Sequence, residues 1–244
     1  ITKWNYQIRR AEDIAWAVSR AFYIASSGRP GPVVLDFTKN AQTAMIDYEP
    51  KNIDFIRSYN PVPTPAEGSV EKAARMINDS VKPFMLVGQG VELADARDEL
   101  LALCEKAQIP FGTTFLGLSA APSDHPLNMG KLGMHGNLAP NVMTNQCDLL
   151  IAVGMRFDDR VTGNLKNYAK QARIIHFDID PSEIDKNVKV NLAVLGDCKH
   201  TLAEVTKLVD AATHNSWIEG FKPYDEKEYN KVIKPAVYPD GGPL

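Results

Sequence analysis

Cysteine is scarce in this chain of 244 residues, and the arrangement of its 3 cysteines excludes two common uses of the residue. Cys104, Cys147 and Cys198 are widely spaced, odd in number and include no CxxC pair. The sequence therefore indicates neither a disulfide framework nor a zinc site, and it favours the reducing cytoplasm. His135 has no second histidine or cysteine at a ligand spacing, so we expect no metal there.

Long apolar runs and an excess of one charge are also missing. The longest apolar stretch, around Leu149–Val153, is far shorter than the roughly 20 residues that span a bilayer. The 27 basic and 30 acidic residues give a net charge of −3, and no Lys or Arg stripe is suited to phosphate backbones or anionic lipid. We expect no nucleic-acid partner and no membrane partner. No nucleophile motif is present either, so we assign no catalytic residue.

We expect no leader peptide at the start of the chain. It opens on Ile1 rather than Met, without a basic-then-apolar segment, so we expect a piece of a longer protein rather than an exported one. What is present is an ordinary globular composition, with 44% hydrophobic and 23% charged residues. Such a chain can bury a sizeable core.

The apolar segments predict helices alternating with strands from Ala66 onward. This alternation favours an α/β fold: a doubly wound, Rossmann-like parallel sheet with helices on both faces. The expected strands are KPFMLVG, IPFGTTF, DLLIAVG, ARIIHFDID and NLAVLGD. The expected helices pass through Ala73 and Ile77, and run over residues 94–107, 138–145 and 201–209. Loops after parallel strands are the usual place for a ligand.

The chain is expected to have a central domain and flanking pieces. Residues 1–40 contain a helix at 11–26 and the strand PVVLDF, which we assign to a preceding domain. Residues 41–65 are rich in proline and predict an extended linker. Residues 66–212 form the central domain. Residues 213–244 predict a polar helix and a second extended segment, PAVYPDGGPL.

The loops expected after the strands share one kind of chemistry. TTFLG, LGMHGN, GMRFDDR, FDIDP and LGDC supply glycines, two arginines and several aspartates. An adenine dinucleotide needs acids for ribose hydroxyls, arginine for the diphosphate and glycine where the backbone comes close. Asp178 and Asp197 suit the sugar or adenine end, and Arg156 and Arg160 suit phosphate. Alternatively, RFDDR is a surface cluster of ion pairs worth about 0–1 kcal/mol each.

Other motifs have less specific interpretations. Gly88 and Gly90, in VGQGVEL, match a dinucleotide-binding turn only in part, because the third glycine is missing. A ligand loop and a simple tight turn both stay open. Asp180, before Pro181, predicts a turn and helix start. Met129 and Met134 are expected to fill gaps in the core.

Several long strings together resemble one enzyme family. ITKWNY, SGRPGPVVLD, GMHG, RFDDRVTG, HFDIDPSEIDKN and GD closely resemble, in the family's order, the catalytic large subunit of acetohydroxyacid synthase, also known as acetolactate synthase. The resemblance implies that residues 1–40 end a pyrimidine-binding domain and that residues 66–212 are the FAD-binding middle domain. The diphosphate-binding domain would follow residue 244.

The resemblance also implies a reaction. Such an enzyme decarboxylates pyruvate on thiamine diphosphate, with Mg, and transfers the hydroxyethyl unit to pyruvate or 2-oxobutyrate in isoleucine and valine biosynthesis. FAD takes no net redox part. The partners implied are the other domains of the chain, a second copy in a homodimer or homotetramer, and a regulatory small subunit.

The resemblance further implies which residues contact the cofactor. For FAD these are Arg29, Gly88, Gln89, Thr114, Phe115, Leu116, Leu132, Gly133, Met134, His135, Gly154, Arg156, Asp158, Arg160, Val161, Asp178, Ile179, Asp197 and Cys198. Lys39 and Asp159 would face the substrate channel. Gln89 departs from the family, because many relatives have glycine there.

Two alternatives remain beside this family. One is the middle domain of another thiamine-diphosphate enzyme, such as glyoxylate carboligase or pyruvate oxidase, against which RFDDRVTG and GMHG argue. The other is a stand-alone nucleotide-binding module.

Residues 1–244 alone are expected to form no acetolactate. The family's activating glutamate of the first domain and its magnesium-binding motif of the third have no counterpart in the sequence. The purified chain is incubated with thiamine diphosphate, Mg and pyruvate and assayed colorimetrically for acetolactate. Detectable turnover would contradict this expectation.

Overall fold

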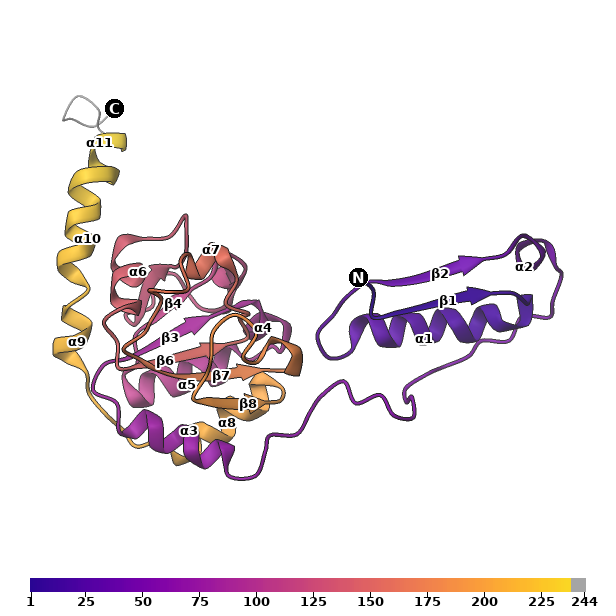
Figure 1. Cartoon of the computed structure of the whole chain (residues 1–244), viewed down its shortest axis with the longest axis horizontal. Coiled ribbons are helices and arrows are strands. Elements are labelled where there is room, and N and C mark those ends of the chain that lie inside the picture. Colours follow the sequence, from indigo (N-terminus) through magenta and orange to yellow (C-terminus); the bar gives the residue numbers. More distant parts are fainter. Residues whose placement is uncertain (238–244) are drawn as a thin grey trace. The chain divides into compact units, whose positions relative to one another are not determined.

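The computed structural model describes residues 1–237, which form two compact units divided after Pro63. The first unit holds two parallel strands and a helix: β1 (Trp4–Ile8), α1 (Ile14–Ser26) and β2 (Val33–Phe37) (Figure 1). Ile8, Ala17 and Ala41 form its small core. The expected helix at 11–26 begins as a single 3₁₀ turn, and β1 was not expected.

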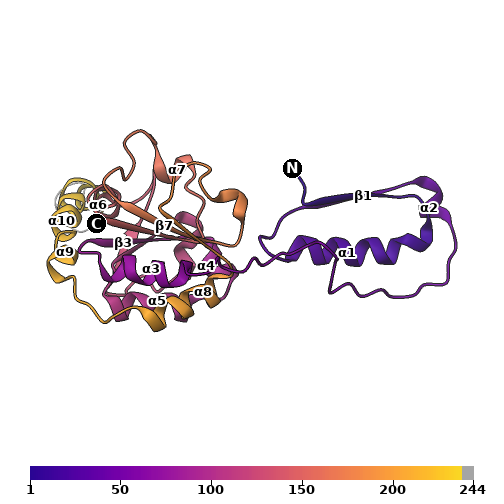
Figure 2. The same ribbon diagram turned by 60° about the horizontal axis from the view of Figure 1, so that its bottom comes forward.

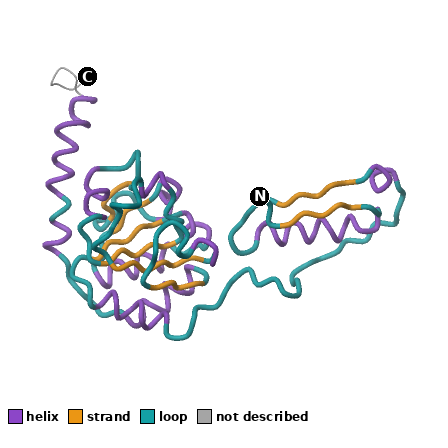
Figure 3. The backbone as a smooth tube through the Cα atoms, viewed as in Figure 1, coloured by secondary structure: helices purple, strands orange, loops and turns teal. Residues whose placement is uncertain are grey.

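The stretch that predicted a linker starts with a helix. α2 (Lys39–Thr43) occupies its first residues, which corrects the expectation of an extended chain from residue 41. Ala41 explains the difference, because its side chain is buried against the first unit. Residues 44–63, all of them described, form no helix or strand and are drawn as loop in Figure 3.

The second unit is built on a parallel sheet of six strands in the order β5-β4-β3-β6-β7-β8. In chain order the strands are β3 (Pro83–Val87), β4 (Phe111–Thr113), β5 (Asn128–Lys131), β6 (Leu149–Val153), β7 (Arg173–Asp178) and β8 (Leu192–Leu195). The predicted α/β fold with a parallel sheet is confirmed. β5 was not predicted because this edge strand has no apolar run.

Alternate strand residues point into two apolar layers, as the period of a strand requires. In β3, for example, Met85 and Val87 enter one layer while Phe84 and Leu86 enter the other. The first layer is covered by α3 (Ser69–Asn78), α5 (Arg97–Ala107) and α8 (Cys198–Leu208), which Figure 2 shows on one side of the sheet. The second is covered by α6 (Leu138–Thr144), α9 (Asn215–Glu219) and α10 (Lys222–Glu228). Helices on both faces are thus confirmed.

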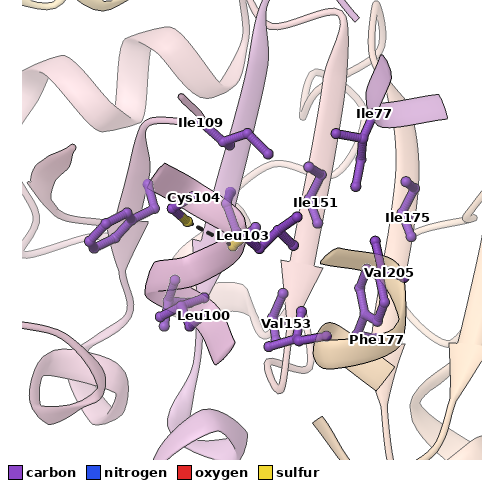
Figure 4. Packing of buried hydrophobic residues seen from close by; sticks show 14 of the residues in the cluster. Ile77, Leu100, Leu103, Cys104, Ile109, Ile151, Val153, Ile175, Phe177 and Val205 are labelled. Atoms are coloured by element: carbon purple, nitrogen blue, oxygen red, sulfur yellow. Dashed lines mark hydrogen bonds between the residues drawn. The ribbon is translucent and has the colours of Figure 1, made fainter. Parts of the chain in front are cut away.

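The first layer is the larger core. Leu103 of α5 lies beside Ile151 of β6, and Val205 of α8 lies beside Phe177 of β7, all without exposure to solvent (Figure 4). Burial also raises the pKa of the Cys104 thiol in this layer far above its ordinary value. This cysteine is therefore a packing residue and not a nucleophile.

The segment after residue 212 packs against the sheet. Trp217 and Phe221 are buried in the second layer, and the Trp217 indole N–H donates to the Pro83 carbonyl at 2.8 Å. α11 (Lys234–Val237) is helical, so the expected extended segment does not begin at Pro235. α11 continues α10 through a π-helical turn (Tyr229–Ile233), so Pro235 lies within a longer helical stretch, where its missing N–H removes one hydrogen bond of that stretch. The rest of that segment lies outside the described residues.

No helix within residues 1–237 is long and apolar enough to cross a bilayer.

Asp148 joins the start of β6 to the turn before β3. Its carboxylate accepts hydrogen bonds from the Ser80 hydroxyl and from the backbone N–H groups of Val81 (2.8 Å) and Lys82 (3.0 Å). Burial acts to raise the pKa of this carboxyl, but the three donors hold the pKa below its ordinary value.

Asp148→Asn is expected to lower the free energy of unfolding by about 1–2 kcal/mol at pH 7. Because the folded carboxyl has the lower pKa, its stabilisation is present above about pH 4 and is lost as the pH falls through the folded value. Urea unfolding at pH 7 and pH 3 should show the difference from wild type shrinking at pH 3. Asp124→Asn, at an exposed position, is the control. A difference that persists unchanged at pH 3 would contradict this account.

Candidate functional site

The exits of all six strands lie side by side at one edge of the sheet. Backbone hydrogen bonds connect neighbouring exits: Leu132 N–H to Thr113 (2.8 Å), Thr114 N–H to Val87 (2.8 Å), Gly88 N–H to Val153 (2.9 Å), Gly154 N–H to Phe177 (2.9 Å) and Gly196 N–H to Asp178 (3.0 Å). Every predicted cofactor contact of the second unit lies in these exits or just beyond them. The structure therefore brings these segments together.

The connections from β3 and β6 leave in opposite directions. The chain after β3 passes along the first apolar layer to β4, and the chain after β6 passes along the second to β7. Such a switch point is where open α/β sheets bind ligands. Here the two turns touch: a Cβ on Gly88 would lie 2.2 Å from the Gly154 carbonyl oxygen, and a Cβ on Gly90 2.5 Å from the Gly154 Cα.

This contact bears on the two interpretations of the VGQG turn, a ligand loop and a simple tight turn. Gly88 N–H donates to the Val153 carbonyl and Gly90 N–H to the Gly154 carbonyl, each at 2.9 Å. Donors engaged in this way are not free for a diphosphate. Gly88 and Gly90 therefore serve close backbone packing, and only Gln89, the first residue of α4 (Gln89–Leu93), is exposed.

The RFDDR turn is only partly neutralised by its own ion pairs. Asp158 caps α7 (Asp159–Thr162) by accepting from the Arg160 N–H at 3.0 Å. Arg156 lies 3.7 Å from the Asp158 carboxylate, and both side chains are substantially exposed, so this pair contributes about 0–1 kcal/mol. Arg160 and Asp159 are exposed, and within residues 1–237 Arg160 has no carboxylate partner. Its positive charge is available to an anion.

The loop after β5 packs against the start of α7. Met134 N–H donates to the Arg160 carbonyl at 2.7 Å, and Gly133, with φ of +95°, has no room for a Cβ beside the same carbonyl. Met134 itself is exposed, so the expectation that it fills the core is wrong; the backbone contact turns its side chain outward. Met129 is partly buried against the second layer, as expected.

Large apolar side chains at the exits of β4 and β5 face solvent. Phe115, Leu116, Leu118 and Met134 are exposed by 47% or more, and Lys131 Nζ lies 5.9 Å from the centre of the Phe115 ring. Exposed apolar groups gathered on two neighbouring loops are typical of surfaces that meet a ligand or another protein. His135 is exposed beside them, and Thr114 and Leu132 are buried.

Asp178 and Asp197, the two aspartates predicted to contact the sugar or adenine end, differ in how many of their carboxylate oxygens already have partners. Asp178 is buried; one carboxylate oxygen accepts from the Asp180 N–H at 2.8 Å, and the other lies 3.4 Å from His176 Nε2. Asp197 caps α8 with one oxygen. Its second oxygen has no hydrogen bond among the described residues, so Asp197 retains an acceptor for a hydroxyl.

The remaining predicted residues have simpler surroundings. Val161 and Ile179 are half-buried. Cys198 is buried, and burial raises the pKa of its thiol to about 12, so the thiol is protonated and not a nucleophile. Arg29, between α1 and β2, and Lys39, at the start of α2, belong to the first unit and stay predictions. The predicted turn at Asp180 is confirmed, because its carboxylate accepts from the Ser182 N–H.

A cavity of about 620 Å³ lies at the opposite end of the strands, and its lining includes Val81, Lys82, Gln146, Trp217, Tyr224 and Lys227. It contains none of the predicted site residues. No cluster of histidine, cysteine and acidic side chains able to hold a metal occurs in the part of the chain that the structure describes.

Two side chains near the site were missed by sequence reasoning. His176 is fully buried in β7, and Asn187 donates to the Phe157 carbonyl at 3.1 Å. The signal for His176 was present, because a histidine interrupts the apolar run of ARIIHFDID. Asn187 stands in a polar loop and carries no such signal.

Comparison with known proteins gives consistent matches. A family model described as "Thiamine pyrophosphate enzyme, central domain" matches residues 70–205. The acetolactate synthase large subunit of Corynebacterium glutamicum is 42% identical over 228 residues, which cover 91% of this chain and 36% of the relative. That of Parasynechococcus marenigrum is 39% identical over 249 residues, covering 98% and 40%.

A solved structure also matches. It is an enzyme from Mycobacterium smegmatis assigned as thiamin diphosphate-dependent, with a TM-score of 0.67 and 25% identity over 86% of this chain and 40% of that one. The chain thus spans about two fifths of the length of the curated relatives it matches.

Gly88→Ala is expected to lower the free energy of unfolding by about 3 kcal/mol, because its Cβ would overlap the Gly154 carbonyl where two turns are hydrogen-bonded together. Gly68→Ala is the matched control: its Cβ meets nothing within 4 Å, and only its φ of +73° costs about 1–2 kcal/mol. Urea unfolding of both variants measures the difference. Equal losses would show that the contact is not tight.

Proposed function

Because the chain belongs to the thiamine pyrophosphate enzyme family, through that family's central domain, we propose that it is the middle part of an acetolactate synthase large subunit. The observation that carries this proposal is the identity to such subunits across nearly the whole chain. The sequence similarity therefore extends beyond the sheet, which a shared fold alone would not explain.

The whole protein would condense two 2-oxo acids, pyruvate with pyruvate or with 2-oxobutyrate. Thiamine diphosphate and Mg would be held by domains outside this chain, since no residue here is assigned to either. The protein would work in the cytoplasm as a homodimer or homotetramer, with a regulatory small subunit as a further partner. The middle domain contributes no catalytic side chain to this scheme.

We propose that the strand-exit edge holds FAD. The edge fits such a ligand in two respects: exposed apolar side chains gather at the exits of β4 and β5, and exposed arginines follow β6. Arg156 and Arg160 would pair with the diphosphate, and the free oxygen of Asp197 would accept from a ribose hydroxyl. FAD would supply no net electron transfer to the condensation, so the chain's task is to bind and orient it.

The hydrogen bonds and close contacts at the strand-exit edge limit which groups could contact FAD. Gly88 would contribute close approach but no N–H donor, because its N–H is bonded to Val153. Gly133 holds the β5 loop against the Arg160 carbonyl, which places Met134 and Arg160 side by side, their side chains 4.0 Å apart. Gln89 and His135, which are exposed, and Val161 and Ile179, which are half-buried, are among the remaining proposed contacts.

Another thiamine-diphosphate enzyme, such as glyoxylate carboligase or pyruvate oxidase, is the alternative. It would keep the same sheet and the same edge, so the product formed by the whole protein separates the two. A stand-alone nucleotide-binding module would instead bind FAD with no activity in any longer form of the chain.

The full chain is expected to bind FAD saturably in a fluorescence titration. Arg156→Ala and Arg160→Ala should each weaken binding by about 10- to 100-fold, the effect of removing one charge-assisted hydrogen bond to phosphate. Arg75→Ala, at an exposed position of α3, is the matched control and should bind like wild type. A folded chain that shows no saturable binding of FAD, or site variants that bind FAD like the control, would contradict the proposal.

A further inference from the structure

His176 lies at the centre of β7 with no exposure to solvent. Its neighbours in the strand, Ile175 and Phe177, belong to the first apolar layer, so His176 enters the second. There its ring meets Phe157 edge-on, with ring centres 5.1 Å apart. Phe157 belongs to the turn that follows β6.

The two ring nitrogens of His176 have different surroundings. Nε2 lies 2.7 Å from the Met155 carbonyl oxygen and 3.4 Å from a carboxylate oxygen of Asp178. Because both are acceptors, we assign the ring proton to Nε2. Nδ1 is buried and has no hydrogen-bond partner among residues 1–237. One N–H thus faces two segments that contain proposed cofactor contacts.

The turn that receives this N–H has an unusual backbone. Gly154 has φ of +59° and Phe157 has φ of +51°, the left-handed region that L side chains rarely adopt. Side-chain donors hold it from the β7 side: His176 at the Met155 carbonyl and Asn187 at the Phe157 carbonyl. Arg156 lies between these two anchored carbonyls.

A purely structural role explains the residue poorly. A leucine of similar size would fill the same layer without leaving a ring nitrogen unpaired, and an unpaired buried polar atom destabilises the folded state. What leucine could not supply is the N–H that meets the Met155 carbonyl.

We propose that His176 is a positioning residue: through Nε2–H it holds the turn after β6 in one conformation and thereby orients Arg156 and Asp158, with Asp178 beside them, for nucleotide binding. The binding part rests on the proposed FAD site. The holding of the turn rests on the geometry alone, so the two parts can be tested separately.

Three variants of the full chain separate positioning from packing. His176→Leu removes the donor and keeps the bulk, and His176→Gln retains an N–H near the position of Nε2. Ile174→Ala is the matched control, because Ile174 is buried in the same strand and the same layer but carries no donor. Circular dichroism and thermal melting first establish that each variant is folded.

The first readout is limited trypsin digestion under native conditions without FAD, followed by mass spectrometry at Arg156 and Arg160. Because trypsin cleaves only chain that opens locally, loss of the anchor should speed cleavage in His176→Leu at least about tenfold. His176→Gln and Ile174→Ala should stay within about threefold of wild type. Cleavage in His176→Leu no faster than in Ile174→Ala would overturn the proposal.

The second readout is the FAD dissociation constant. His176→Leu should raise it at least about fivefold, and His176→Gln should restore it to within about twofold of wild type. A wild-type chain that binds FAD while His176→Leu binds equally well would overturn the positioning role. If the wild-type chain binds no FAD, the proposed function fails by that result, and the trypsin comparison still supports or overturns the holding of the turn.

Discussion

The backbone contact between the Gly88–Gly90 turn and Gly154 is the constraint on which the candidate site depends. It closes the switch point between β3 and β6, where the connections diverge to opposite faces of the sheet. Because no side chain separates the two turns, their N–H and carbonyl groups bond to each other. The glycines therefore fix the positions of the two strand exits relative to each other, and their N–H groups serve the packing of the fold. We therefore expect side chains farther along the β6 connection, rather than these two N–H groups, to meet an anion at this edge.

The strand-exit edge has two halves with different side-chain chemistry. Apolar side chains are exposed after β4 and β5, whereas arginines and aspartates follow β6, β7 and β8. The loop after β5 joins the halves, since Met134 N–H bonds to the Arg160 carbonyl. A long ligand with an apolar planar end and a charged middle would match this order of groups, which supports the proposal of a flavin dinucleotide. His176 of β7 then links the charged half to the sheet through its contact with the Met155 carbonyl.

Much of the fold could be predicted because local pattern and burial agree. The run around Leu149–Val153 became the central strand β6, and the helical spacing of Leu100, Leu103 and Ala107 became the buried face of α5. The prediction missed β5, whose sequence NMGK is half-buried and has no apolar period. It missed α2, where a single alanine supplies the burial. Short elements of this kind are stabilised by neighbours distant in sequence, which no local pattern records.

The sequence by itself determined the fold class and the chemistry of the strand-exit loops, because apolar periodicity and residue type are local properties. It also carried the resemblance from which the residues of the proposed cofactor site were named. Only the tertiary structure decided which groups remain free. The N–H groups of Gly88 and Gly90 are engaged, one oxygen of Asp197 accepts no hydrogen bond from residues 1–237, and His176 faces a carbonyl 21 residues before it in the chain. The physical reason is that hydrogen-bond partners across a parallel sheet are set by strand order, and strand order is a property of the assembled sheet.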